Sequence, residues 1–208
     1  MLQIPLFLFD KYNAMTRLKI LVCGDSFAAS RHPLSWTSLL TQNHDVGQHG
    51  WKGCGEYKIY QQLTMQSITE YDLIIVSHTS ATRVHIKNHP LYQYPHEHFN
   101  ADLIYNDVNY HRTENAILDT AARYFEQIFD IEYYEFVHSM ILQKINSDMS
   151  EKCSLHLFPL HFPKEVPFEH WIDTRKIAEM HPGTINHYDQ LGNKKVFDQI
   201  NQWIEKNY

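Results

Sequence analysis

The sequence predicts a single α/β domain built on a parallel β-sheet. Two short apolar runs, Leu18–Cys23 and Asp72–Ser77, have the near-continuous hydrophobic character of strands that are buried on both faces. Segments with apolar residues at helical spacing alternate with these runs along the chain. The length of 208 residues suits one ordinary domain, and the chain contains no internal repeat or low-complexity linker.

The first half of the chain contains the two clearest strands and the loops that follow them. Its predicted elements are, in order, a strand at Leu18–Cys23, a helix at Pro33–Leu40, a turn-rich loop at Asp45–Gly55, a helix at Glu56–Gln66 and a strand at Asp72–Ser77. The turn-rich loop carries four of the seven glycines, namely Gly47, Gly50, Gly53 and Gly55. Because parallel sheets bind ligands at the carboxyl ends of their strands, the loops after both strands are candidate site segments.

The second half begins with a segment that shows no periodicity. We therefore interpret residues 84–112 as a surface insertion or lid. Long irregular loops of this kind are often functional. The later predicted elements are a helix at Thr113–Phe129 capped by Thr113 or Asn115, a helix at Tyr133–Asn146, a strand at Cys153–Leu160 and an amphipathic helix at Lys194–Lys206. Residues 1–16 are expected to be an N-terminal extension of the same domain.

Composition argues against several classes of function. The formal net charge is −6 and the 18 Lys and Arg residues are dispersed, so we expect no nucleic-acid partner. No run approaches the ~18 apolar residues that a membrane span needs. Met1–Phe9 lacks a basic start and a small-residue cleavage site, so it does not predict a secretory signal. Three widely spaced cysteines, Cys23, Cys54 and Cys153, are typical of reduced thiols and predict a cytoplasmic protein.

Two residues at opposite ends of the chain form a possible nucleophile and base. Ser26 follows the first predicted strand in Gly24-Asp25-Ser26, where a tight turn presents the hydroxyl at the edge of the sheet. His187 lies in a loop directly before the last predicted helix, from which it could reach back to Ser26. A serine hydroxyl needs a base to become a good nucleophile, and an imidazole titrates near neutral pH.

These blocks resemble those of the SGNH, or GDSL-like, hydrolases, a family of serine esterases. The family opens with a strand followed by Gly-Asp-Ser and closes with a His-containing block before the terminal helix, as this chain does. The resemblance implies a three-layer α/β/α sandwich of the flavodoxin-like sort and acyl transfer without a cofactor. Ser26 would be the nucleophile, and its N–H with that of Gly53 would form the oxyanion hole. His187 would be the base, and His181 is a weaker candidate for that role.

The chain departs from the family pattern at two positions. The third block of the family is Gly-x-Asn-Asp, whereas this chain has a polar string from His78 to Arg83, with Thr79 where the Asn is expected. The Thr79 hydroxyl could donate to the oxyanion, or His78 or Ser80 could fill that role. The family also carries an Asp three residues before the His, where this chain has Thr184. A backbone carbonyl could orient the base instead, or an acid could come from elsewhere in the chain.

Other side chains are candidates for contact with a substrate. Asp25, His78 and Arg83 are expected near the strand ends, and Arg83 could pair with an anionic group of the substrate or form an internal ion pair. The string His96-Glu97-His98 has some character of a metal site, but no Cys or Asp stands at ligand spacing, so we expect no metal. The aromatic residues of the insertion fit a lid, a small satellite core or a dimer contact.

The predicted function is hydrolysis of a small acyl ester, with a small-molecule or carbohydrate substrate and possible self-association. Two alternatives stay open. The altered third block and the missing acid would also fit a catalytically silent domain that binds a ligand or partner. The same chemistry with a sugar or nucleoside hydroxyl as acceptor would make the protein an acyltransferase.

Overall fold

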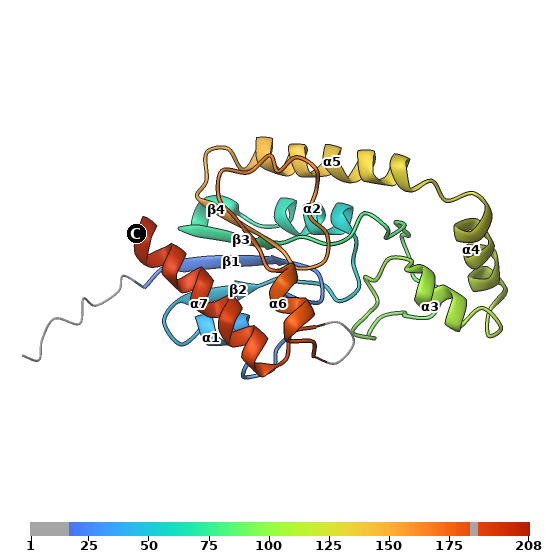
Figure 1. Cartoon of the computed structure of the whole chain (residues 1–208), viewed down its shortest axis with the longest axis horizontal. Helices are drawn as coiled ribbons and strands as arrows, with labels where there is room; N and C mark the ends of the chain where they lie inside the picture. Colours follow the sequence, from blue (N-terminus) through green and yellow to red (C-terminus); the bar gives the residue numbers. More distant parts are fainter. Residues whose placement is uncertain (1–16, 184–186) are drawn as a thin grey trace, which may run out of the picture.

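The structure, a computed structural model, describes residues 17–183 and 187–208. One sheet of five parallel strands has the spatial order β2-β1-β3-β4-β5. In chain order the strands are β1 (Lys19–Gly24), β2 (Asp45–Gln48), β3 (Leu73–Ser77), β4 (Ser154–Phe158) and β5 (Trp171–Asp173). Helices lie on both faces and give three layers (Figure 1), so the predicted α/β class with a parallel sheet is confirmed.

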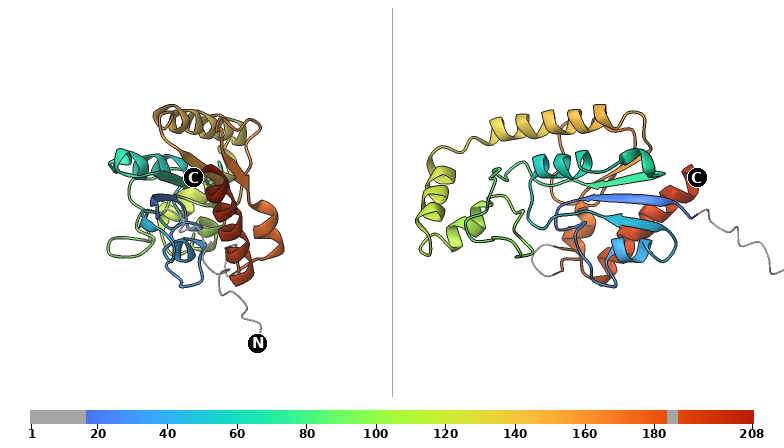
Figure 2. Two further views of the ribbon diagram at one scale, coloured as in Figure 1. Left: turned by 90° about the vertical axis from the view of Figure 1, so that its left-hand side faces the viewer. Right: turned by 180° about the vertical axis from the view of Figure 1, so that it is seen from behind.

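The helices divide into three groups by position. One face of the sheet carries α1 (Trp36–Leu40), α6 (Arg175–Met180) and α7 (Gln190–Asn207), and the other carries α2 (Glu56–Thr64) and α5 (Ile131–Asp148). The remaining elements are a 3-10 helix before β3, η1 (Ile68–Glu70), and two helices beyond the strand ends, α3 (Tyr105–Tyr110) and α4 (Ala116–Gln127). Figure 2 shows that α3 and α4 stand apart from the sheet.

Strand β1 supplies both hydrophobic cores. Ile20 and Val22 pack on the side of α1 and α7, whereas Leu21 and Cys23 pack on the side of α2 and α5. All four side chains are fully buried. Successive side chains of a strand point to opposite faces, so a strand covered on both sides needs an unbroken apolar run. This is why β1 and β3 were readily predicted from the sequence.

Several short elements were not predicted, among them η1, α3, the two edge strands and α6. Strands β2 and β5 form the two edges of the sheet, and each pairs with only one neighbour. Strand β2 reads Asp-Val-Gly-Gln and none of its residues is buried, so it shows no apolar run. Strand β5 has three residues and helix α6 has six, which is too short for a periodic pattern.

The predicted insertion is closed at its base and partly folded. Val84 and Leu103 form an antiparallel bridge, so the two ends of the intervening segment meet. Leu103 and Val108 then pack with Leu118 of α4 in a small separate cluster. A satellite core is therefore present, but it contains no aromatic residue of the insertion, so the alternatives for those aromatic residues stay open. Aliphatic residues form the core, whereas Tyr94 is 80% exposed.

The starts of α1, α4, α5 and α7 are marked by capping side chains. Asn115, one of the two predicted caps, accepts a hydrogen bond from the N–H of Ile117 at the start of α4. Helix α7 begins earlier than predicted, because the Asp189 carboxylate accepts from the N–H of Gly192 and so caps Gln190. None of the helices within residues 17–183 and 187–208 combines the length and apolar character that a bilayer crossing requires.

Candidate active site

The candidate site lies where the chain changes direction across the sheet. From β1 the chain runs to β2 on one side, and from β3 it runs to β4 on the other side. In doubly wound sheets, ligands bind at such a switch point, outside the carboxyl ends of the two central strands. Ser26 follows β1 and the string from His78 to Arg83 follows β3. The two predicted site segments therefore meet at this position.

Gly24 lets β1 and β3 come together at the start of the site. Its φ angle is +150°, and a Cβ atom at this position would lie 2.6 Å from the carbonyl oxygen of Ser77. The Gly24 carbonyl accepts hydrogen bonds from the Trp51 N–H at 2.9 Å and from Gln62 Nε2 at 3.0 Å. The Trp51 bond fastens the loop between β2 and α2, which contains Gly53 and is called the glycine-rich loop below, to the end of β1, and the Gln62 bond fastens α2 to the same carbonyl.

Asp25 is the buried anchor of the turn that carries Ser26. Its Oδ1 accepts the N–H of Phe27 at 3.0 Å, and its Oδ2 accepts the Thr79 hydroxyl at 3.1 Å and Arg83 Nη2 at 3.0 Å. Burial raises the pKa of Asp25, and the nearby Arg83 charge opposes that rise. Asp25 therefore joins the loops after β1 and β3 from inside the protein, rather than facing a substrate.

Two backbone donors beside this anchor are open. Ser26 is half-buried at the turn. Among the described residues, neither the N–H of Ser26 nor that of Gly53 donates to an acceptor. Gly53 has a φ angle of +74°, a left-handed conformation that glycine adopts without strain. Unpartnered N–H groups at a ligand-binding edge are suited to an anion or an oxyanion.

His187 lies next to the Ser26 turn. Its ring makes an edge contact with that of Phe27, with ring centroids 5.2 Å apart. Its charge also acts to lower the pKa of Asp25, behind the larger effects of burial and Arg83. Thr184, where the family carries an acid, lies outside the described residues. The structure thus brings the predicted base to the predicted nucleophile's turn and leaves the third member of the triad open.

The two ends of the chain are joined at this position by a buried tryptophan. Trp36 Nε1 donates to the Phe27 carbonyl at 2.8 Å, and its backbone N–H donates to Asn193 Oδ1 at 3.0 Å. Asn193 Nδ2 in turn donates to the Tyr188 carbonyl at 3.0 Å. The block around Ser26 and the block around His187 are therefore one connected structure.

Three side chains of the third block, those of His78, Thr79 and Arg83, are engaged inside the protein, whereas Ser80 is half-buried and its hydroxyl lies 2.9 Å from that of Thr82. The single hydroxyl hydrogen of Thr79 points to Asp25, and the Thr79 side chain is fully buried. Arg83 donates to Asp25 and, at 2.6 Å, to the Cys54 carbonyl, so the internal ion pair is the alternative that the structure contains. His78 is 1% exposed and stacks against Phe158, which places it in the core and away from any substrate.

A buried hydrogen-bonded chain starts from His78. His78 Nδ1 lies 2.7 Å from Glu56 Oε1, and its Nε2 lies 2.9 Å from His156 Nδ1. His156 Nε2 continues the chain to Ser154 Oγ at 3.0 Å. Only one hydrogen fits between the two facing ring nitrogens, so this chain cannot hold two imidazolium ions without breaking.

The charges along this chain are unequal. Burial alone would raise the pKa of Glu56, but the charge and hydrogen bond of His78, together with His138, hold it below its usual range. Burial lowers the pKa of His156 well below its usual value, and the neighbouring His78 adds to that effect. These directions favour a negative charge at Glu56 and a neutral imidazole at His156 in the hydrogen-bonded chain. The second Glu56 oxygen accepts the N–H of Thr79 at 3.1 Å and so holds the third block in place.

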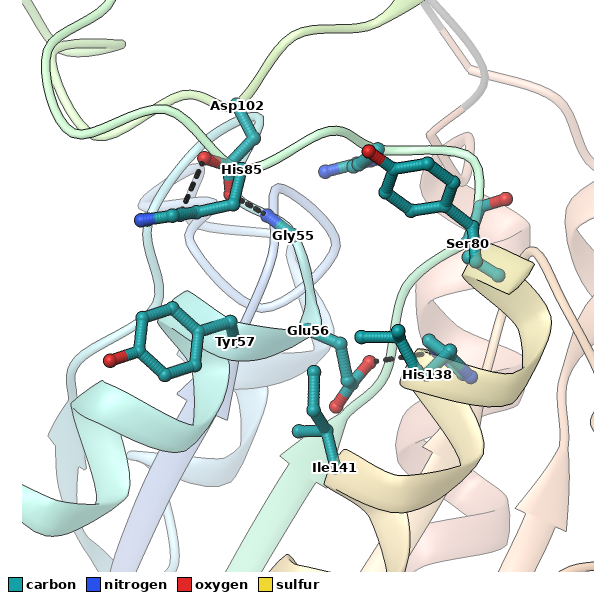
Figure 3. A pocket seen from close by; sticks show the side chains of 12 residues that line it. Gly55, Glu56, Tyr57, Ser80, His85, Asp102, His138 and Ile141 are labelled. Atoms are coloured by element: carbon teal, nitrogen blue, oxygen red, sulfur yellow. Dashed lines mark hydrogen bonds and ion pairs between the residues drawn. The ribbon is translucent and has the colours of Figure 1, made fainter. Parts of the chain in front are cut away.

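Two cavities open near α5. The smaller, of about 70 Å³, lies between the start of α2, the loop after β3 and α5, and Figure 3 shows Glu56, Ser80 and His138 on its wall. The larger, of about 770 Å³, lies between α5 and residues 161–167 and shares His138. Neither is lined by Ser26 or His187.

The histidines of the insertion form a stack of rings. His89, Tyr92 and His96 stack with centroids 4.5 and 4.8 Å apart, and His98 tilts against the same tyrosine. Within the described residues, no group of three His, Cys, Asp or Glu side chains is placed to hold a metal ion. Glu97 pairs with Lys52 of the glycine-rich loop instead.

Three important polar residues were missed from the sequence. Glu56, Asp102 and His156 are all buried and each bonds to several groups. A signal existed for two of them. His156 stands between two leucines of a buried strand, and Asp102 stands between Ala101 and Leu103. A lone polar residue in an apolar setting indicates a buried group with a specific partner.

A comparison of the chain with models of known protein families gives no match, and no curated protein is significantly similar to it in sequence. The fold and the site define a parallel α/β protein with polar groups at its switch point. Any narrower assignment depends on the resemblance of the blocks around Ser26 and His187.

Proposed function

We propose that this protein is a serine acyl hydrolase of the SGNH type, with Ser26 as nucleophile and His187 as base. The observation that carries the proposal is the pair of open N–H groups at Ser26 and Gly53, beside a serine at the switch point. The contact between His187 and Phe27 supports it, because it brings an imidazole to the same turn. The expected substrate is a small acyl ester, on a carbohydrate or another small molecule, and no cofactor is needed.

In the proposed mechanism, Ser26 Oγ attacks the ester carbonyl while His187 takes the hydroxyl proton. The carbonyl oxygen becomes an oxyanion and accepts hydrogen bonds from the N–H groups of Ser26 and Gly53. His187 then gives its proton to the leaving alcohol, and the acyl group stays on Ser26. Water, activated by His187, attacks that ester and releases the carboxylic acid.

The third block limits the rate that we expect. Thr79 can donate to the oxyanion only by giving up its bond to Asp25. Loss of one oxyanion donor typically costs a factor of about 10²–10³ in turnover. We therefore expect a slow esterase whose rate depends on two backbone donors. The three cysteines form no disulfide, which supports a reducing location such as the cytoplasm as part of the same proposal.

The test is intact-mass analysis after treatment with a fluorophosphonate, which an activated serine attacks at phosphorus with loss of fluoride. Wild type should gain one adduct, and Ser26→Ala and His187→Ala should gain none. Ser154→Ala is the matched control, because the Ser154 hydroxyl is hydrogen-bonded to a histidine, His156. Its adduct should equal that of wild type. An adduct that persists in Ser26→Ala and disappears in Ser154→Ala would move the nucleophile to Ser154.

One observation favours the alternative of a silent binding domain. Thr79 and Arg83 are both held by Asp25, so neither of these two side chains is free to contact a substrate. Under that alternative, folded wild type would take up no fluorophosphonate and would hydrolyse no acyl ester. Those two results together would replace the hydrolase proposal.

A further inference from the structure

Besides the ion pair of Glu97 with Lys52, the insertion holds the backbone of the glycine-rich loop through Asp102. The backbone N–H of Asp102 donates to the Gly53 carbonyl at 3.0 Å. The Asp102 carboxylate accepts the N–H of Gly55 through Oδ2 at 2.6 Å. One residue thus holds the loop on both sides of Cys54. Figure 3 shows Asp102 above Gly55 at the mouth of the smaller cavity.

Asp102 is itself rigidly placed. Its Oδ1 lies 2.9 Å from Lys58 Nζ and 3.2 Å from His85 Nδ1, and it accepts the Ile86 N–H at 3.0 Å. The Asp102 side chain is 1% exposed and that of Lys58 is 5% exposed. A buried carboxylate with four donors is held in one position, because leaving any of those groups unpaired is costly.

Lys58 connects this arrangement to α2 and to both arms of the insertion. Its ammonium donates to the Ile86 carbonyl at 2.8 Å and to the Ala101 carbonyl at 3.0 Å, besides its contact with Asp102. An ammonium has three hydrogens, so all of them are used. The base of the insertion is therefore fixed to a helix of the main domain, and it cannot swing as a free lid would.

The loop is also held at two further positions, Cys54 and Gly53. Arg83 Nη1 donates to the Cys54 carbonyl at 2.6 Å. Gly53 packs so closely on Ala101 that an added Cβ would lie 2.9 Å from the Ala101 Cβ. Because Asp102 holds the Gly53 carbonyl and the Gly53 φ angle is +74°, the direction of the Gly53 N–H is fixed.

We infer that Asp102 is a positioning residue for the reaction, and that the insertion serves as a brace that aims the Gly53 N–H at the oxyanion. The inference rests on the proposed function, in which Gly53 is an oxyanion donor. It assigns Asp102 no contact with the substrate. Asp102 acts through the loop, so its removal should slow the chemical step and leave substrate binding nearly unchanged.

The test compares Asp102→Asn with wild type in the rate of fluorophosphonate labelling and in kcat and KM for an acyl ester. Asparagine has the same shape and keeps one acceptor, but it loses the charge that faces Lys58. We expect labelling and kcat to fall about 10- to 100-fold, with KM within about threefold, because one oxyanion donor is misaligned. Asp102→Glu, which restores the charge, should recover part of the loss.

Two controls separate positioning from loss of stability. Asp107→Asn changes an exposed carboxylate of the same insertion and should react as wild type does. Leu118→Ala weakens the satellite core without touching the loop, and it should lower the unfolding midpoint while leaving kcat within about twofold. If Asp102→Asn does not fold, the double variant Asp102→Asn with Lys58→Met is tested instead, because it also removes the unpaired ammonium.

The outcomes are distinguishable. If wild type is labelled and Asp102→Asn reacts at the wild-type rate, the proposed role of Asp102 is wrong, whereas the hydrolase proposal still holds. A loss in Asp102→Asn that only matches the loss in Leu118→Ala would also overturn the brace, because stability alone would explain it. Folded wild type that takes up no label would overturn the proposed function, and the brace with it.

Discussion

The guanidinium of Arg83 lies 3.0 Å from the Asp25 carboxylate, in an ion pair whose side chains are 8% and 0% exposed. The pair joins the loops after β1 and β3, since each residue follows one of these strands. Removing one member of a buried pair leaves the other charge without compensation. The stability of the switch point should therefore depend strongly on this contact.

We predict that Arg83→Ala lowers the free energy of unfolding by about 3–5 kcal/mol, measured by urea denaturation at pH 7. Arg83 opposes the raised pKa of Asp25, so its loss raises that pKa further. A carboxyl group with a raised folded-state pKa loses stability as pH rises, so the difference from wild type should shrink toward pH 4. The control is Arg112→Ala, which removes more exposed pairs with Asp119 and Glu126 and should cost much less than Arg83→Ala. Equal losses in the two variants would contradict the prediction.

Gly24→Ala should be strongly destabilising. Its φ angle of +150° is unfavourable for any other residue, and the new Cβ would meet the Ser77 carbonyl at 2.6 Å. Backbone strain of this kind costs about 1–3 kcal/mol, to which the clash adds. Gly47→Ala is the control, because its Cβ would first meet the Tyr71 hydroxyl at 3.1 Å, at the movable end of a side chain. Thermal denaturation of both variants checks this, and a similar midpoint for the two would rule the explanation out.

Acid should destabilise the fold from pH 6.5 downward. The pKa of His156 is lowered from 6.5 by burial, so below that pH the unfolded chain binds a proton that the native chain does not. Glu56, with its lowered pKa, adds a loss in the same direction below pH 4.5. For one such proton the slope is at most about 1.4 kcal/mol per pH unit.

Replacing His156 by asparagine tests this slope, because asparagine keeps a polar atom facing His78 and does not titrate. The melting temperature of His156→Asn should change less between pH 7 and pH 5 than that of wild type. His96→Asn, at an exposed position of the insertion, should keep the wild-type slope. Parallel slopes in all three proteins would show that His156 does not set the acid response.

Only one thiol of the native protein should react readily. Burial raises the pKa of Cys23 to about 12 and raises that of Cys54 well above its usual value. Because the thiolate is the reactive form, both should resist iodoacetamide at pH 8, whereas half-buried Cys153 should be alkylated. Mass spectrometry should find one added group on the native chain and three after denaturation, with none on native Cys153→Ser. Native alkylation of Cys54 at the rate of Cys153 would refute this.

Sequence patterns predicted the parts of the fold that depend on local periodicity. The continuous apolar runs of β1 and β3 predicted a parallel sheet, since both faces of these strands are covered. The edge strands β2 and β5 were missed because an edge needs no such run. The position of Ser26 after β1 followed from the same reasoning, because a strand end and a turn are both local features.

The internal partners of the site could not be predicted in that way. Arg83 was an open choice between a substrate anion and an internal pair, and only tertiary structure brings Asp25 within reach of it. His78 was expected to face a ligand, but its partner His156 lies 78 positions away in the chain. Such long-range hydrogen bonds leave no periodic trace in the sequence.

The hydrogen bond between Trp36 and Asn193 joins residues 157 positions apart, and this separation bears on the timing of biosynthesis. A chain leaving the ribosome has released Ser26 and the whole insertion long before Asn193 exists. Contacts between such distant residues close late, because the entropy of a long loop must be overcome first. If His187 is the base, a nascent chain carries an inert Ser26 until His187 has been synthesised and has folded against the turn after β1.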